Sequence, residues 1–242
     1  MLKNIEGQKI PSLSFPMIDN GAWAKRTTES IFDNKTVIVF ALPGAFTPTC
    51  SSTHLPRYNE LAETFFANGV DEIVCLSVND TFVMNAWAEN QHAEKISFIP
   101  DGNGDFSQAM GMLVDKSDIG FGKRSWRYAM LVKNGVIEKM FIEPEVEGDP
   151  FEVSDADTML NYINPNATQK QTVTVFSKPD CPFCKKAKQL LNEKGLSFEA
   201  LEVGKDISLS TLKAVANAET VPQVFIDGEL IGGSEALEVY FK

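Results

Sequence analysis

Two separate segments of this chain share one arrangement: a short apolar strand, a turn that contains proline, and a cysteine where a helix begins. In the first, the apolar residues 37–42 stop at Pro43, and Cys50 follows. In the second, residues 172–176, four β-branched residues and a phenylalanine, precede the sequence Cys-Pro-Phe-Cys, which starts at Cys181. Strands that alternate with helices favour a sheet covered by helices on both faces. The repetition therefore predicts two α/β units in one chain.

The length and the charge of the chain agree with this organisation. Its 242 residues, 43% of them hydrophobic, are enough for two packed cores. Residues 164–171 hold a proline and polar residues without periodicity, so we expect a linker there, between domains at 1–163 and 172–242. The net charge of −11 and the lack of a basic cluster argue against nucleic-acid and membrane partners.

The number of cysteines and the N-terminal sequence bear on the compartment. No stretch of 18 apolar residues and no apolar leader segment is present, so we expect neither a membrane span nor a secretory signal. Four cysteines are too few for a disulfide scaffold in a chain of this length. We therefore predict a cytoplasmic protein whose cysteines at helix starts are catalytic or metal-binding.

Hydrophobic periodicity and turn residues predict the order of the elements. In the first unit we expect a mostly parallel sheet, with strands at 36–42 and 71–79, helices at 52–69 and 81–90, and a hairpin at 128–143. In the second unit we expect the order β-α-β-α-β-β-α, over residues 172–176, 181–195, 197–203, 208–218, a hairpin at 223–233 and a helix from 234. Ser234 is the expected N-cap of that last helix.

The setting of Cys50 favours an ionised thiol. A thiol reacts as its thiolate, and a helix N-terminus stabilises the anion because its N–H groups are unpaired. Thr47 is placed to hydrogen-bond an oxygen next to the sulfur, and Pro43 and Pro48 stiffen the loop. The alternative is a buried, unreactive cysteine that packs as a small apolar side chain.

The sequence around Cys50 resembles the peroxiredoxins. Their signature Pro-x-x-x-Thr-x-x-Cys is met by Pro43, Thr47 and Cys50, and the likeness to the type II group covers about residues 1–163. The resemblance implies that Cys50 is the peroxidatic cysteine, that Thr47 hydrogen-bonds the peroxide and that Pro43 shapes the pocket. It also implies that Arg127 holds the thiolate and polarises the leaving oxygen; the alternative is a surface arginine at the start of a strand.

Two further residues of this unit have open roles. Some type II relatives use a cysteine at the position of Cys75 to resolve the oxidised sulfur, but its place in the middle of an apolar strand favours burial. His54 is expected either to cap the helix or to pack near the site.

The pair Cys181 and Cys184 predicts a redox motif at a helix start, with the first thiol more exposed and the second more buried. Asp180 is the expected helix cap, which would place Cys181 in the first turn. A zinc site is the alternative, but a single Cys-x-x-Cys pair without a histidine supplies only two of four ligands. We therefore expect no bound metal or other resident cofactor. An iron–sulfur cluster shared by two chains is a further alternative, which the proline of the motif disfavours.

Residues 171–242 resemble the glutaredoxins, on the sequence CPFC, on TVPQVFIDG from Thr220 and on IGGSEAL before the last helix. The resemblance implies a disulfide between Cys181 and Cys184 and a cis-proline at Pro222. It also implies a glutathione site in which each group of residues has its own part of the ligand. Thr220 and Val221 would hold the glutathione backbone, Gly233, Ser234 and Glu235 its glutamyl end, and Lys178 its glycyl carboxylate.

The two resemblances together predict two thioredoxin-like domains, each a mixed sheet flanked by helices, and a glutathione-dependent peroxidase. Hydrogen peroxide and small alkyl hydroperoxides would oxidise Cys50, and glutathione, the co-substrate that glutathione reductase regenerates, would restore it with help from Cys181. The short linker favours a relay between chains of a homo-oligomer, a dimer or a tetramer. The alternatives are a general glutathione-disulfide oxidoreductase, a peroxide-sensing redox relay, and a holdase.

Overall fold

The computed structural model describes residues 2–19, 21–167 and 171–242, which form two compact units. The division lies between residues 168 and 169. The last helix of the first unit is α6 (Ala156–Ile163), and the first strand of the second is β10 (Val173–Ser177). Residues 168–170 of the expected linker lie outside the described residues.

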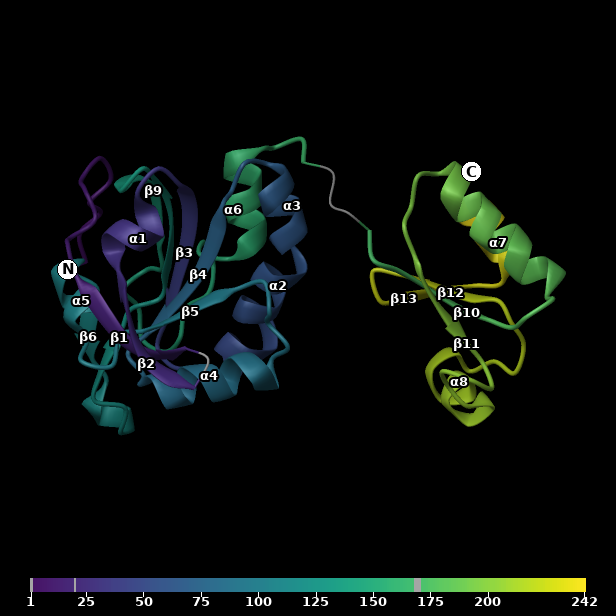
Figure 1. The fold of residues 1–242 in the computed structure, drawn as a ribbon, viewed down its shortest axis with the longest axis horizontal. Helices are drawn as coiled ribbons and strands as arrows, with labels where there is room; N and C mark the ends of the chain where they lie inside the picture. The colour runs from purple at the N-terminus through teal and green to yellow at the C-terminus, as the bar shows by residue number, and fades with distance from the viewer. Residues whose placement is uncertain (1, 20, 168–170) are drawn as a thin grey trace. The chain divides into compact units, whose positions relative to one another are not determined.

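The first unit contains a five-stranded mixed sheet in the order β5-β4-β3-β8-β9 (Figure 1). Its strands are β3 (Thr36–Leu42), β4 (Glu72–Ser77), β5 (Ser97–Pro100), β8 (Tyr128–Lys133) and β9 (Val136–Ile142). Strands β3, β4 and β5 run parallel, whereas β8 and β9 run antiparallel to their neighbours. The sheet is therefore mixed, as the resemblances predict, and not mostly parallel as the alternation of strands and helices alone suggests, because the hairpin of β8 and β9 joins the sheet beside β3.

Alternate residues of β3 enter two separate cores. Ile38, Phe40 and Leu42 face one core, and Val37 and Val39 face the other, all of them without measurable exposure. The first core is covered by α2 (Leu55–Glu60), α3 (Ala62–Ala67), α4 (Thr81–Asn90) and α6; the second by α1 (Thr28–Phe32) and α5 (Asp105–Ala109). Helices on both faces explain why this strand reads as a continuous apolar run.

The predicted helix at 52–69 is interrupted at two places; Pro56, which the sequence leads us to expect either at a bend or in a first turn, lies in the first turn of α2. The first part of this region is the π-helical segment η1 (Cys50–His54), in which the Leu55 N–H donates to the Cys50 carbonyl. Pro56 follows in the first turn of α2 and has no N–H to give to a carbonyl, so the bonding pattern changes there. Leu61, with φ −83° and ψ 1°, separates α2 from α3.

Smaller elements complete the first unit. They are the two-stranded sheets of β1 (Ser14–Asp19) with β2 (Ala22–Thr27) and of β6 (Leu113–Asp115) with β7 (Lys123–Ser125), and the 3₁₀ turn η2 (Ser117–Ile119). None of the helices in the described parts of the chain has the length and apolar character that crossing a membrane requires.

The second unit has the predicted element order around a four-stranded sheet, β11-β10-β12-β13. Its remaining elements are β11 (Glu199–Glu202), β12 (Gln223–Ile226), β13 (Glu229–Gly232), α7 (Pro182–Glu193), α8 (Leu209–Ala216) and α9 (Ser234–Tyr240). Apolar residues of α7 and α9 pack on one face and those of α8 on the other, and Figure 1 shows α7 and α8 on opposite sides of the sheet.

Both predicted hairpin turns are confirmed. Asn134 and Gly135 join β8 to β9 with φ of 46° and 73°, and Asp227 and Gly228 join β12 to β13 with φ of 51° and 80°. A two-residue turn with both φ positive has the twist that antiparallel strands need, and asparagine, aspartate and glycine tolerate that conformation best.

Candidate active site

The pairing of β3 with β8 brings Cys50 and Arg127 together, although they lie 77 residues apart in sequence. Ala41 pairs with Tyr128 in antiparallel register. The carboxyl end of β3, which continues into the loop that carries Cys50, therefore lies beside the amino end of β8, where Arg127 precedes the strand. The sheet register thus decides the position of the candidate site.

Cys50 is the first residue of η1 and is completely buried. Helical backbone already starts at Pro48, and the Ser51 N–H donates to the Thr47 carbonyl at 3.0 Å. The indole N–H of the buried Trp87 in α4 donates to Ser51 Oγ at 3.0 Å. These contacts fix the sulfur in the first turn of the helix, as the sequence predicts.

The loop before Cys50 is held by one hydrogen bond within the loop and by another to Asn79. Thr47 Oγ1 donates to the Gly44 carbonyl at 2.8 Å, and the Ala45 N–H donates to Asn79 Oδ1 at 3.0 Å. Phe46 adopts a left-handed backbone conformation with φ 63°, which is unfavourable for a side chain of its size. The surrounding hydrogen bonds therefore maintain a strained turn, and this turn sets the direction of Thr47 and of the thiol.

Arg127 is buried, with 1% of its side chain exposed, so its alternative as a surface residue is wrong. Its Nη1 lies 3.5 Å from Cys50 Sγ and 3.0 Å from His54 Nδ1. Its Nη2 lies 2.5 and 2.6 Å from the two carboxylate oxygens of Asp149. Burial alone lowers the pKa of Arg127, but its neighbours Cys50 and Asp149 raise it above its usual value.

His54 occupies the N-cap position of α2, but its side chain makes no capping hydrogen bond and packs into the site instead, which is the second of its two expected roles. Burial, aided by the charge of Arg127, lowers its pKa to about 3, so the ring is neutral at physiological pH. Its Nδ1 accepts from Arg127, and its Nε2, 3.1 Å from the Ser154 carbonyl, therefore carries the proton. The ring gives Arg127 an uncharged acceptor.

The segment from Glu143 to Ser154 wraps the other side of Arg127. The Glu143 carboxylate, 1% exposed, accepts the N–H groups of Glu152, Val153 and Ser154 and the hydroxyl of Ser154. Sequence reasoning missed Glu143, the last residue of the predicted hairpin, and Asp149, which stands in the acidic, irregular stretch after it. No signal in the sequence alone separates these two carboxylates from their exposed neighbours.

A pocket of about 270 Å³ lies beside this cluster. Its lining brings together Pro43, Thr47 and Arg127 from the predicted site. The rest of the lining is mainly apolar, with Lys116 and Asp149 as further charged groups; it comprises Pro48, Thr49, Lys116, Ile119, Phe121, Trp126, Gly148, Asp149 and Pro150. An apolar pocket with few convergent polar groups is the usual form of a small-molecule site.

Cys75 lies in the middle of β4 and is buried in the same core as Cys50. Burial, with a smaller effect of the nearby Cys50 charge, raises the pKa of the Cys75 thiol well above its usual value. A neutral, enclosed thiol is a poor nucleophile, which supports the reading of Cys75 as a core residue.

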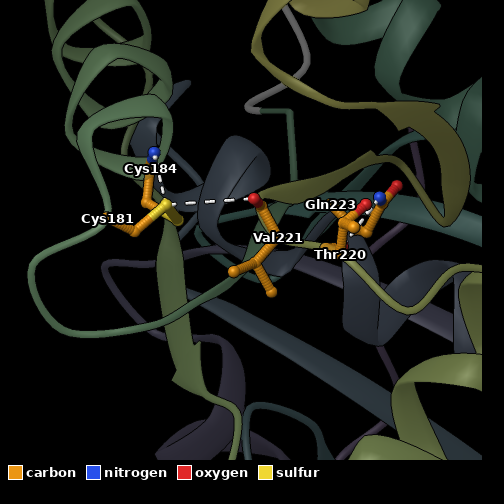
Figure 2. Close-up of a disulfide and its surroundings, with 5 residues drawn as sticks. All are labelled: Cys181, Cys184, Thr220, Val221 and Gln223. Atoms are coloured by element: carbon orange, nitrogen blue, oxygen red, sulfur yellow. Dashed lines mark hydrogen bonds between the residues drawn. A yellow bond between two sulfur atoms is a disulfide. The ribbon is translucent and has the colours of Figure 1, made fainter.

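In the second unit, Cys181 and Cys184 form a disulfide at the start of α7 (Figure 2). Cys181 is itself the N-cap of the helix, and its sulfur accepts the Cys184 N–H at 3.1 Å. The expectation that Asp180 caps the helix is wrong, because the chain turns at Asp180 with φ 54° and the sulfur takes the capping position. As predicted, Cys181 is partly exposed, whereas Cys184 is 2% exposed.

Three of the predicted glutathione-binding residues, Val221, Pro222 and Gly233, lie close to one another beside the disulfide. The Val221–Pro222 peptide bond is cis, as predicted, and the Val221 carbonyl oxygen lies 3.8 Å from Cys181 Sγ (Figure 2). Gly233 follows β13 and lies so close that a Cβ there would be 3.8 Å from the Pro222 carbonyl oxygen. Thr220 is exposed on the same segment.

The remaining predicted residues lie after β10 and at the start of α9. Lys178 follows β10 and is exposed, and Glu235 is exposed in the first turn of α9. The expectation that Ser234 is the N-cap is wrong: Gly233 occupies that position, and Ser234 is the first helical residue, with its side chain buried. Among the described residues there is no cluster of three or more His, Cys, Asp or Glu residues arranged to hold a metal ion.

Comparisons with known proteins agree with this geometry. Residues 5–160 match the Redoxin family, and residues 173–231 match the Glutaredoxin family. The chain is 62% identical over 240 residues to the Hybrid peroxiredoxin hyPrx5 of Haemophilus influenzae, a match that covers 99% of this chain and 100% of that protein. It is also 62% identical over 145 residues to Peroxiredoxin sll1621 of Synechocystis, covering 58% of this chain and 77% of that protein.

A solved structure extends the comparison to three dimensions. The structure of reduced Prx3 from Vibrio vulnificus in complex with H₂O₂ is 41% identical in sequence, with a TM-score of 0.63, and the match covers 66% of this chain and 99% of that one. Sequence and fold therefore lead to the same family. The chain belongs to the Redoxin family: it is a peroxiredoxin, a peroxidase of the oxidoreductase class, whose redoxin domain is followed by a glutaredoxin domain.

Proposed function

We propose that this chain reduces hydrogen peroxide and small alkyl hydroperoxides with electrons from glutathione, and that Cys50 is the residue that peroxide oxidises. The Cys50 thiolate attacks one peroxide oxygen, an S–O bond forms, and the O–O bond breaks. The sulfur loses two electrons and becomes a sulfenic acid, and the leaving oxygen takes a proton and departs as water or an alcohol.

The observation that carries this proposal is the place of Arg127 next to the Cys50 sulfur. Nη1 lies 3.5 Å from Sγ, at a pocket that Thr47 and Pro43 also line. A buried guanidinium favours the thiolate over the thiol, and it stabilises negative charge that develops on the leaving oxygen. The apolar lining suits an alkyl group attached to the peroxide.

The second unit supplies the proposed reduction. One glutathione thiol condenses with the sulfenic acid to give a mixed disulfide and water. The Cys181 thiolate then attacks the glutathione sulfur, which frees Cys50, and a second glutathione releases Cys181 as a thiol with formation of oxidised glutathione. The net reaction consumes one peroxide and two glutathione molecules. A partly exposed cysteine at a helix N-cap, beside the group of Val221, Pro222 and Gly233, supports this role.

The test follows peroxide-dependent oxidation of NADPH in the presence of glutathione and glutathione reductase. The intact chain is compared with Cys50→Ser and Cys181→Ser, and Cys75→Ala is the matched control. We expect both serine variants to lose turnover and the control to keep it. Full turnover by Cys181→Ser refutes the relay, and full turnover by Cys50→Ser refutes the assignment of the peroxide-reactive residue.

We further propose that the relay operates between chains of a homo-oligomer, since the predicted linker of eight residues is short for two active sites of one chain to meet, about 15 Å by random-coil scaling. Equal amounts of the inactive Cys50→Ser and Cys181→Ser chains are mixed and allowed to exchange subunits. Recovery of turnover is expected, because each chain then supplies the cysteine that the other lacks. Exchange without recovery contradicts a relay between chains.

A second candidate function is general reduction of glutathione mixed disulfides. It is favoured by one observation: every residue of the predicted glutathione site belongs to the second unit. The Cys50→Ser chain should then still reduce a glutathionylated test substrate at the rate of the intact chain. Loss of that activity together with peroxide turnover removes this candidate.

A further inference from the structure

We propose that Asp149 is the permanent counter-ion of Arg127: it neutralises the buried guanidinium in those states of the reaction in which the Cys50 sulfur carries no charge. The inference rests on the proposed role of Cys50 as the residue that peroxide oxidises. It makes Asp149 a positioning residue, which acts through Arg127.

The geometry singles out this carboxylate. Both oxygens of Asp149 lie on Nη2 of Arg127, at 2.5 and 2.6 Å, while Nη1 is shared by Cys50 and His54. The arginine is 1% exposed, whereas the Asp149 side chain is 43% exposed. A partly hydrated anion on the pocket rim thus contacts a cation that is almost fully removed from water.

The other charged and titratable groups around Arg127 do not serve as its counter-ion. His54 is neutral, as its low pKa shows, and supplies only a lone pair. The Glu143 carboxylate is engaged by backbone N–H groups and a hydroxyl. Lys116 on the pocket lining is a second cation, with Nζ 4.8 Å from the centre of the Trp126 ring.

The charge of the cluster changes during the proposed reaction. In the reduced state the Cys50 thiolate and the Asp149 carboxylate share one guanidinium. After oxidation the sulfur is a neutral sulfenic acid and then a neutral mixed disulfide, so one anion has disappeared. A buried cation without a partner is strongly destabilising, and Asp149 is the anion that remains.

Two contacts hold the backbone near Asp149 in place, whatever the state of the sulfur. Lys116 Nζ donates to the Gly148 carbonyl at 3.4 Å, and the Glu143 carboxylate accepts the Glu152 N–H at 2.8 Å. The backbone is therefore anchored both before and after Asp149, which keeps its carboxylate beside Arg127. This arrangement suits a counter-ion that stays in position through the whole reaction cycle.

The test is a double-mutant cycle on the intact chain, in which Cys50→Ser replaces the thiolate by a neutral group. Thermal unfolding is followed by tryptophan fluorescence at about pH 8, where thiolates form readily. All three tryptophans lie in the first unit, so the signal reports that unit alone; they are Trp23, Trp87 and Trp126. The midpoints of four proteins are compared: the parent, Asp149→Asn, Cys50→Ser and the double variant.

We expect Asp149→Asn to lower the midpoint by at least about 4 °C more in the Cys50→Ser background than in the parent, because only there does it leave Arg127 without any anion. The matched control is Asp157→Asn. The Asp157 side chain is 48% exposed, and its partner Arg57 is 28% exposed, whereas Arg127 is 1% exposed. This control should shift both backgrounds equally. Equal shifts for Asp149→Asn as well overturn the proposal.

A second readout separates charge compensation from a structural role. Alkylation of Cys50 is timed below neutral pH, in chains that also carry Cys181→Ser and Cys184→Ser. Asp149→Asn should accelerate alkylation about threefold or more, because Arg127 then acts on the Cys50 thiolate alone and a larger fraction of the thiol is ionised. Slower alkylation would mean that Arg127 has lost its position beside Cys50, and it overturns the proposal. Neither readout depends on turnover. Failure of the proposed function, either a failed relay or an active Cys50→Ser chain, is therefore detected in the NADPH assay and is distinguished from failure of the proposal about Asp149.

Discussion

Mild acid should destabilise the redoxin domain, and His54 should account for about 2 kcal/mol of the loss between neutral pH and about pH 5. The perturbation that reveals this share is His54→Asn. Asparagine places an amide oxygen near the position of Nδ1, so it keeps an acceptor for Arg127 and removes the only titratable group of the side chain.

The magnitude follows from the difference between the two states of the histidine. In the unfolded chain its pKa is near 6.5, whereas burial lowers it to about 3 in the folded protein. Between these values the unfolded state binds one proton more, so stability falls with decreasing pH by about 1.4 kcal/mol per unit. The stabilisation is fully present above pH 6.5. From there to about pH 5 the loss is about 2 kcal/mol.

The assay is denaturant unfolding of the intact chain between about pH 8 and pH 5, followed by tryptophan fluorescence. Other titrating groups, such as Asp101, whose buried carboxyl has a raised pKa, act on both proteins alike and cancel in the comparison. The parent should lose about 2 kcal/mol more than His54→Asn over this range. Identical pH slopes would falsify the assignment of His54 as a neutral, buried acceptor.

Three further substitutions test the elements around the site. Glu143→Gln should lower the stability of the domain by about 2–3 kcal/mol and slow peroxide turnover, because the charged acceptor of the Ser154 segment is lost; unchanged unfolding contradicts this. Thr47→Val should cost about 1 kcal/mol through the lost bond to Gly44 and slow turnover, and a variant with parental kinetics removes Thr47 from the mechanism. Cys75→Ala should cost about 1–2 kcal/mol while turnover stays at the parental value, and a drop in turnover would make Cys75 a participant.

The candidate sites divide into residues that motifs reveal and residues that they do not. Pro43, Thr47 and Cys50 form one continuous motif, since a loop of fixed length joins a strand to a helix. Cys181 and Cys184 are found in the same way. The roles of these residues remain proposals, but their positions at helix starts could be predicted because the signal is local.

Capping and helix continuity were less predictable. Asp180 and Ser234 are residues of the right type for N-caps, yet the sulfur of Cys181 and the backbone of Gly233 occupy those positions. Propensity describes what a residue can do in isolation, whereas the course of the folded chain decides which residue caps the helix: it turns at Asp180 with φ 54° before α7, and Gly233 follows β13 directly before α9. Pro56 is expected from the sequence to bend the helix or to lie in its first turns, and it lies in the first turn of α2; the second break, at Leu61, has no such signal.

By itself the sequence determined the two α/β units, the strands β3, β4, β8 and β9 and the helical regions 52–69 and 81–90 of the first, every element of the second, both hairpin turns and the two cysteine motifs, because each of these rests on short-range periodicity or turn chemistry. The remaining strands and α-helices of the first unit were not predicted; they are β1, β2, β5, β6, β7, α1, α5 and α6. Only the tertiary structure decided the strand order of the first sheet and the environment of Arg127. The contacts of that side chain come from His54, Asp149 and Cys50, which are separated by up to 99 residues and meet because β8 pairs with β3. Burial then fixes their charges, and burial is a property of the packed core, which no local pattern in the sequence contains.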